Sequence, residues 1–185
     1  MKKIHQEVVD DVLKNSIPKS VGHRIPWLFI GLVGGLLAAG IINRFETILQ
    51  KNLILAAFIP LVVYMADAVS AQMESFVIRD TALHPRIQFM RYFFRQFLIV
   101  LIIGATISIA LFLFSWFFYH QTKIALVVTL GMFIAILSSI CTGLFIPFIF
   151  EKTNLDPANA SVPISTIIQD VLSVIIYFYI ASWIL

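Results

Sequence analysis

The sequence predicts an all-α integral membrane protein whose chain crosses the bilayer five times. Hydrophobic residues make up 60% of the chain and charged residues only 12%, against about 45–50% and about 25% in soluble domains. Five continuous apolar runs are long enough to span a membrane. A soluble domain of 185 residues does not bury so much apolar surface, so lipid is the solvent we expect for it.

The five runs match the about 20 residues that a spanning helix needs, although the first is short and the second and fourth are long. They cover Trp27–Asn43, Leu53–Ile78, Phe97–Tyr119, Ile124–Phe150 and Ser161–Leu185. A membrane barrel would instead show short segments of alternating hydrophobicity, so we expect no strands.

Residues 1–26 form the only polar segment of any size, and residues 27–185 form the predicted transmembrane domain. Apolar side chains at Ile4, Val8 and Val12 share one face of a short amphipathic helix, which Pro18 would end. Two interpretations stay open for this segment. It is an anchor lying in the membrane interface, or it is a plug at the mouth of a pore.

In the first run, small residues recur every four positions at Gly31, Gly35 and Ala39. Such a stripe lets a neighbouring backbone approach closely. We therefore expect this face of the first helix to contact another helix.

The second run carries Asp67, Ser70 and Glu74 at spacings of three and four, on one helical stripe. Because no basic residue lies in the middle of any run, these buried acids need a proton or a metal. Oxygen ligands without cysteine or histidine suit hard cations such as Mg²⁺ and Ca²⁺. Glu74 lies nearer the helix end, so a solvated position at the mouth is its alternative.

Prolines interrupt two of the apolar runs, at Pro60 and Pro147. Each removes a backbone donor and frees a carbonyl oxygen, which is tolerated at membrane depth where the backbone lines a cavity or packs within protein. We predict that Pro60 lines the pathway, with a simple kink as the alternative.

The fifth run places Asp170 near mid-depth, in a stripe with Thr166, Ser173 and Tyr177 that Ser165 and Gln169 widen. A charged side chain at this depth costs about 2.5–3.5 kcal/mol on insertion scales and usually marks a pathway. We interpret the stripe as the wall of a cation path. The alternative is a hydrogen-bond cluster that only packs helices.

Basic residues set the expected orientation and exclude other classes of protein. Ten lysines and arginines flank the runs on the side of the N-terminus and three on the other, which predicts a cytoplasmic N-terminus and an external C-terminus. The single cysteine, Cys141, forms no disulfide framework within one chain. No histidine or lysine lies at membrane depth to serve as a base, so we expect no enzyme. Because the basic residues flank apolar runs, we expect no nucleic-acid partner.

These residues resemble the transmembrane domain of the MgtE family of Mg²⁺ channels and transporters. The resemblance runs from Arg24 nearly to the C-terminus. It rests on an ordered set of motifs: Arg24-Ile25-Pro26-Trp27-Leu28, Phe58-Ile59-Pro60-Leu61, Gln72 with Val77-Ile78-Arg79, Pro147-Phe148, Leu155-Asp156-Pro157-Ala158, and Pro163 with Asp170 and Ile176-Tyr177.

The resemblance implies a homodimer with one pore on the two-fold axis, lined by the second and fifth helices. Asp170 matches the residue that binds the hydrated ion, and Thr166 the position that exposes a carbonyl to it. Val162 replaces a common asparagine, and the family's glycine- and asparagine-rich signature is here Ala66-Asp67-Ala68 and Ser70-Ala71-Gln72. We expect no counterpart of the family's cytosolic N-domain and paired CBS modules in the 26 residues before the first run, and we therefore expect gating by the N-terminal segment or the membrane domain itself.

We therefore expect a channel or transporter for a divalent cation, Mg²⁺ in particular, in a bacterial-type inner membrane. The predicted metal site comprises Asp170, Thr166, Asp67 and Glu74, and the other predicted pore-lining residues are Ser70, Gln72, Ser173, Val162 and Pro60. A secondary transporter coupled to Na⁺ or H⁺ and a non-conducting scaffold or regulatory subunit are the alternatives.

Overall fold

The computed structural model describes residues 15–84, 87–151 and 157–185, and every regular element in these ranges is a helix. The elements are α1 (Ile17–Arg44), α2 (Glu46–Lys51), α3 (Leu53–Leu83), α4 (Phe89–Tyr119), α5 (Thr122–Ile140), the π-helical turn η1 (Cys141–Phe145), α6 (Ile146–Glu151) and α7 (Pro157–Ile184). Five stretches are long and apolar enough to cross a membrane, so the predicted count of spans is confirmed.

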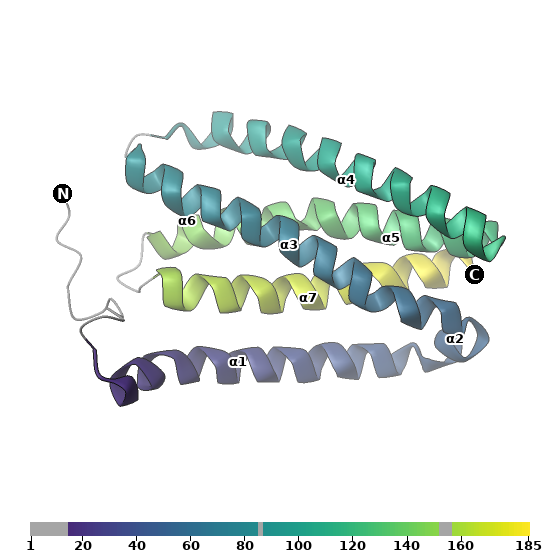
Figure 1. The fold of residues 1–185 in the computed structure, drawn as a ribbon, viewed down its shortest axis with the longest axis horizontal. Helices are drawn as coiled ribbons and strands as arrows, with labels where there is room; N and C mark the ends of the chain where they lie inside the picture. Colours follow the sequence, from purple (N-terminus) through teal and green to yellow (C-terminus); the bar gives the residue numbers. More distant parts are fainter. Residues whose placement is uncertain (1–14, 85–86, 152–156) are drawn as a thin grey trace.

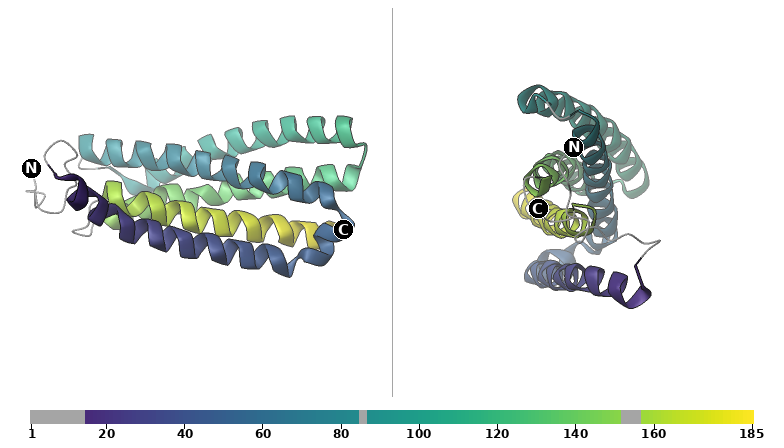
Figure 2. Two further views of the ribbon diagram at one scale, coloured as in Figure 1. Left: turned by 60° about the horizontal axis from the view of Figure 1, so that its bottom comes forward. Right: turned by 90° about the vertical axis from the view of Figure 1, so that its left-hand side faces the viewer.

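The long helices lie side by side along one axis, and α3 crosses the bundle obliquely (Figure 1). Helices α3, α5 and α7 all contact one another, while α1 packs on α7 and α4 packs on α5 (Figure 2). The buried core accordingly lies between the three central helices, where Val62, Met132 and Phe178 are at most 1% exposed. Helix α1 is peripheral, and Gly34 is its one buried residue.

Helices α1 and α4 begin well before the apolar runs predicted. Helix α1 begins at Ile17, with Pro18 in its first turn, where the missing N–H has no helical acceptor in any case. Helix α4 begins at Phe89, because arginines interrupt the hydrophobic pattern there without interrupting the helix. The amphipathic helix predicted around Ile4, Val8 and Val12 lies outside the described residues.

Pro60 and Pro147, which the sequence analysis singled out, behave differently. Helix α3 continues through Pro60 without a break. Pro147 stands in the first turn of α6, directly after the π-helical turn η1, and such wider turns often accompany functional sites. Gly143 within η1 lies so close to α3 that an added Cβ would stand 2.5 Å from the carbonyl oxygen of Ser70.

The predicted contact stripe on the first helix is right at Gly31, where an added Cβ would lie 4.0 Å from Ile167, and wrong in its rotation at Gly35 and Ala39. An added Cβ on Gly34 would meet the side chain of Ile167 at 2.2 Å, whereas one on Gly35 would meet nothing within 4 Å. Ala39 is exposed. The contact with α7 therefore runs through Gly34, because the packing angle of the two helices selects a face that four-residue spacing alone does not identify.

Candidate cation site

Helices α3 and α7 bring together the three carboxylates that the sequence singled out. Asp67 and Glu74 are seven residues apart on α3, which places them on one face, and Asp170 comes from the neighbouring α7. Asp67 lies close enough to both other acids to repel them electrostatically. It is therefore the central member of the group.

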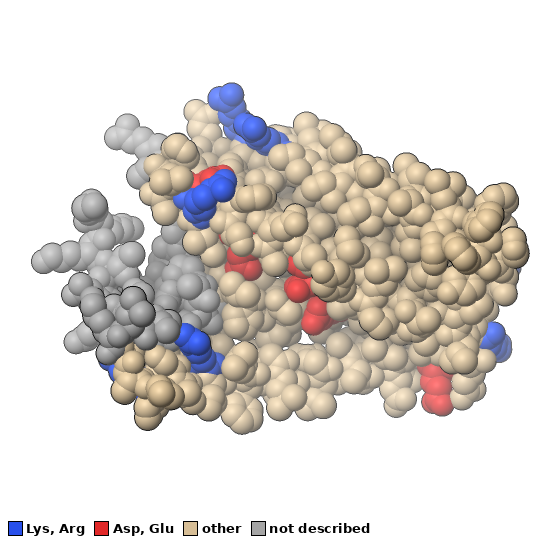
Figure 3. Space-filling model, in the orientation of Figure 1, with Lys and Arg blue, Asp and Glu red and all other residues tan. Residues whose placement is uncertain are grey.

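The group lies at a hollow on one face of the chain. Figure 3 shows acidic side chains on the floor of this hollow, away from both ends of the molecule. Asp67 and Asp170 are partly exposed, whereas Glu74 is only 2% exposed. The partly exposed Thr166 on α7 interacts through its side chain with Asp67 across the helix interface.

Hydroxyl groups hold the buried carboxylate of Glu74. The Oγ of Ser161 donates a hydrogen bond to Glu74 Oε1, and the side chain of Ser165 interacts with the same carboxylate. Glu74 is thus a fixed internal acid and not the solvated mouth residue that the sequence left open. Within the described ranges, the interactions of the three acids are with hydroxyls and with one another, and none is with a lysine, arginine or histidine.

A second polar stripe on α7 points into the bundle. It consists of four buried residues at spacings of four: Ser161, Ser165, Gln169 and Ser173. The amide of Gln169 is its hub. Its Nε2 donates to Ser138 Oγ and Ser173 Oγ, both at 3.0 Å, and to Ala135 O at 3.2 Å.

The same hub connects α7 to η1 and α3. Thr142 Oγ1 donates to Gln169 Oε1 at 2.7 Å and lies 2.8 Å from Ser70 Oγ. Three transmembrane segments are therefore linked by buried hydrogen bonds directly behind the carboxylate group. Sequence analysis did not single out Thr142, and for the stripe that includes Gln169 it named a helix-packing hydrogen-bond cluster only as the alternative.

Ser70 and Ser173, predicted to line the pore, are 1% and 0% exposed. Both hydrogen-bond within the bundle, so the structure corrects their role to packing. The physical reason is helical rotation, because at 3.6 residues per turn Ser173 stands about 40° from Gln169 but about 60° from Asp170. The predicted stripe combined residues from two faces.

The other predicted pore-lining residues are exposed. Pro60 precedes Asp67 by seven residues and shares its face, and Val162 lies two turns before Asp170, in line with Thr166. Gln72 stands about 140° away from Asp67 around the helix axis, so the structure does not bring it to the carboxylates.

The arrangement suits a cation that keeps its water. No three side chains of the histidine, cysteine, aspartate or glutamate types in the described ranges are close enough to hold a bare metal ion together. Carboxylate and hydroxyl oxygens on a hollowed face can still accept hydrogen bonds from the water shell of a hydrated ion. Mg²⁺ gives up that shell reluctantly.

Comparison with known proteins decides the family. Residues 59–180 match the model of a family described as MgtE, divalent cation transporter. The chain belongs to the MgtE family. Its helices α3 to α7, which carry all three carboxylates, lie almost wholly within the matched region. The family is described as one of divalent cation transporters, and the five spans make this chain a multi-pass membrane protein.

Three relatives are similar along most of this MgtE-family chain, and each is named magnesium transporter MgtE. The protein of Bacillus subtilis is 34% identical over 86% of the chain, and that of Enterococcus faecalis 31% identical over 94%. The protein of Thermus thermophilus is 26% identical over 88%. The chain spans 36–39% of the length of these relatives.

Proposed function

We propose that this MgtE-family chain carries hydrated Mg²⁺ across the membrane along a path lined by Asp170, Asp67, Glu74 and Thr166. The observation that supports this most is the meeting of three carboxylates on neighbouring spanning helices with no basic partner among the described residues. The magnesium transporters among its relatives support the choice of ion.

The charge distribution gives a physical reason for a divalent ion. Asp67 repels both Glu74 and Asp170, and each ionised carboxylate at this depth is costly. A cation that enters the site offsets both the repulsion between the carboxylates and the cost of their charge at this depth. A doubly charged ion gains twice the attraction of a singly charged one. Water molecules of the hydrated ion then donate hydrogen bonds to the carboxylate oxygens.

A second copy of the chain is part of this proposal. Asp67 and Asp170 are partly exposed on the open face of a single chain, where in a bilayer they would meet lipid. A two-fold partner covering that face places the same acids of both copies around one central path. The path then lies on the axis of a homodimer, between helices α3 and α7 of each copy.

The membrane orientation in the proposal follows from the basic residues. The end of the bundle where α1 begins also holds Arg79, Arg91 and Arg95, whereas Lys51 and Lys123 lie at the opposite end. The excess of basic residues places the first end in the cytoplasm.

The decisive experiment measures Mg²⁺ uptake into proteoliposomes by Asp170→Asn. A hydrogen bond to a charged group contributes about 1.5–3 kcal/mol, so we expect ion binding to weaken about ten- to a hundredfold and uptake at limiting Mg²⁺ to fall accordingly. Glu46→Gln is the matched control, because it removes a carboxylate from the short α2, far from the site. Wild-type uptake by a folded Asp170→Asn protein would remove this residue from the path.

The same proteoliposomes separate the competing functions. Uptake driven by membrane potential alone, without a Na⁺ or H⁺ gradient, is expected for a channel. Uptake that requires one of those gradients would identify a coupled transporter instead. Absence of uptake by purified, folded protein for every divalent ion tried would favour a scaffold or regulatory subunit.

A further inference from the structure

A basic groove lies along the first turns of α4 and extends to the last turns of α3. Two adjoining cavities of about 360 and 310 Å³ form it, and both are lined by Tyr92 and Arg95. Arg91 lines the first cavity, and Arg79 and Asp80 line the second. None of these five residues belongs to the carboxylate group of the cation site.

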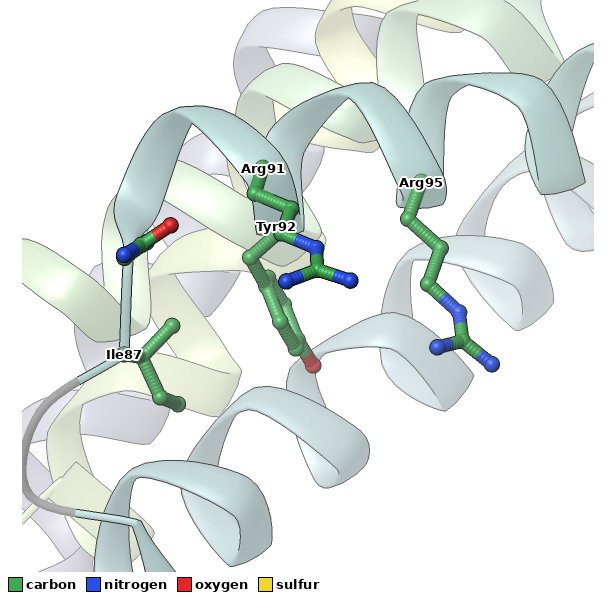
Figure 4. A pocket seen from close by; sticks show the side chains of 5 residues that line it. Ile87, Arg91, Tyr92 and Arg95 are labelled. Carbon is green, nitrogen blue, oxygen red and sulfur yellow. The ribbon is translucent and has the colours of Figure 1, made fainter.

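The charges in this groove are not balanced. Asp80 is already occupied, because it accepts hydrogen bonds from Arg79 at 3.1 Å and from the hydroxyl of Tyr92 at 3.0 Å. Arg91 and Arg95 have no acidic partner among the described residues. Two positive charges therefore remain in the groove, on the same side of α4 as the ring of Tyr92 (Figure 4).

The depth of the groove matches the headgroup layer of a bilayer. Helix α4 has 31 residues, so it is about 46 Å long, whereas the hydrocarbon core is about 30 Å thick. A centred helix extends about 8 Å beyond the core at each end, which is about five residues. Arg91 and Arg95 are the third and seventh residues of α4 and thus lie at this boundary.

An apolar track continues the line of the two arginines toward the membrane centre. Leu98 follows Arg95 by three residues and Ile102 follows by seven, so all lie on one helical stripe. These two side chains are 56% and 65% exposed. The groove thus offers positive charge at headgroup depth and an open apolar surface directly below it.

We propose that this groove binds the phosphate of an anionic phospholipid, with Arg91 and Arg95 on the headgroup and the acyl chains along Leu98 and Ile102. Arginine presents planar paired donors that fit phosphate oxygens. The adjoining apolar track favours a lipid over a free phosphate ion, because a free ion gains nothing from Leu98 or Ile102. This binding site is separate from the proposed cation path.

Native mass spectrometry of the full chain in detergent tests the proposal, with phosphatidylglycerol and phosphatidylcholine as probes. We expect wild-type protein to retain phosphatidylglycerol preferentially. The Arg91→Gln/Arg95→Gln variant should lose at least about tenfold in affinity for it. The Arg44→Gln/Lys51→Gln variant removes two exposed basic residues at the other end of the bundle and should bind as the wild type does.

Further arms of the experiment identify the source of the phosphate. Glycerol 3-phosphate carries the phosphate without acyl chains, so we expect no displacement of bound lipid by an equal concentration of it. Displacement would overturn the assignment to a lipid. Equal losses in the two double variants would overturn the site, since diffuse attraction to basic residues predicts that result. If the double variant does not fold, Arg91→Gln and Arg95→Gln singly should each lose binding, and wild-type binding by both would also overturn it.

Discussion

At the scale of single residues, two kinds of polar groups interact across the described spanning helices. Glu74, Asp67 and Asp170 interact with hydroxyls and with each other. Gln169 and its partners form a closed network of neutral groups. The three carboxylates have no positively charged partner among the described residues, which suits a passing cation. The polar groups of the Gln169 network hydrogen-bond to one another, which suits helix packing.

We predict that Asp67→Asn changes ion preference more than it changes assembly. Asp67 is the acid that interacts with both of the others. When the charge of Asp67 is removed, a divalent ion loses twice the attraction that a monovalent ion loses. The ratio of Mg²⁺ to Na⁺ uptake should fall roughly five- to tenfold. Flux of both ions measured in the same proteoliposomes checks this, and an equal loss for both ions would indicate a structural role for Asp67.

We predict that Gln169→Leu destabilises the fold. Its amide supplies hydrogen bonds to Ser138, Ser173 and the Ala135 carbonyl, and each bond that leucine removes contributes about 0.5–1.5 kcal/mol to stability. The thermal unfolding temperature in detergent should fall. The exposed Gln72→Leu is the matched control and should unfold near the wild-type temperature. Equal unfolding temperatures for the two variants would contradict a stabilising role for the hydrogen bonds of Gln169.

At the scale of whole helices, α1 is the element least tied to the rest. Only 11% of its most apolar window is buried, against 56% for the span formed by α5, η1 and α6. Its contact with α7 depends on the close approach at Gly34, where Ile167 fills the space of a side chain. Two adjacent glycines thus have opposite roles in one helix.

We predict that Gly34→Ala weakens the packing of α1 on α7 while Gly35→Ala does not. The new methyl group at position 34 would overlap Ile167, and overpacking typically costs about 1–3 kcal/mol. At position 35 it meets open space, and alanine is about 1 kcal/mol better than glycine within a helix. Thermal unfolding of the two variants side by side checks the pair. A lower unfolding temperature for Gly35→Ala would contradict this assignment of faces.

At the scale of the whole molecule, the open face that carries Asp67 and Asp170 is the main reason to propose a second copy. We predict that a disulfide forms between copies of Val162→Cys in a Cys141→Ser background. Val162 is 41% exposed and precedes Thr166 of the proposed path by about one turn of α7. Phe114→Cys, at an exposed position on α4, should stay monomeric on a non-reducing gel. Equal cross-linking of both variants, or of neither, would contradict a dimer axis at α3 and α7.

Local properties of the chain determined much of this architecture. Hydropathy over a window of about 20 residues depends only on the residues within it, so the five spans were predictable. The same holds for Asp170, Asp67 and Glu74, because an acid inside such a window stands out whatever surrounds it. Their closeness across α3 and α7 was expected from the family resemblance and not from spacing.

The tertiary structure alone decided which face of each helix points inward. Ser70 and Ser173 belong to the buried network, and Gly34 instead of Gly35 makes the close contact, although the spacing patterns favoured other assignments. A helix of regular period allows several polar or small-residue stripes. The choice among them depends on rotation about the axis, which is fixed by side chains of other helices far away in the sequence. The sequence by itself therefore determined where the chain crosses the membrane, and the packing of α3, α5 and α7 determined what each crossing presents to the path.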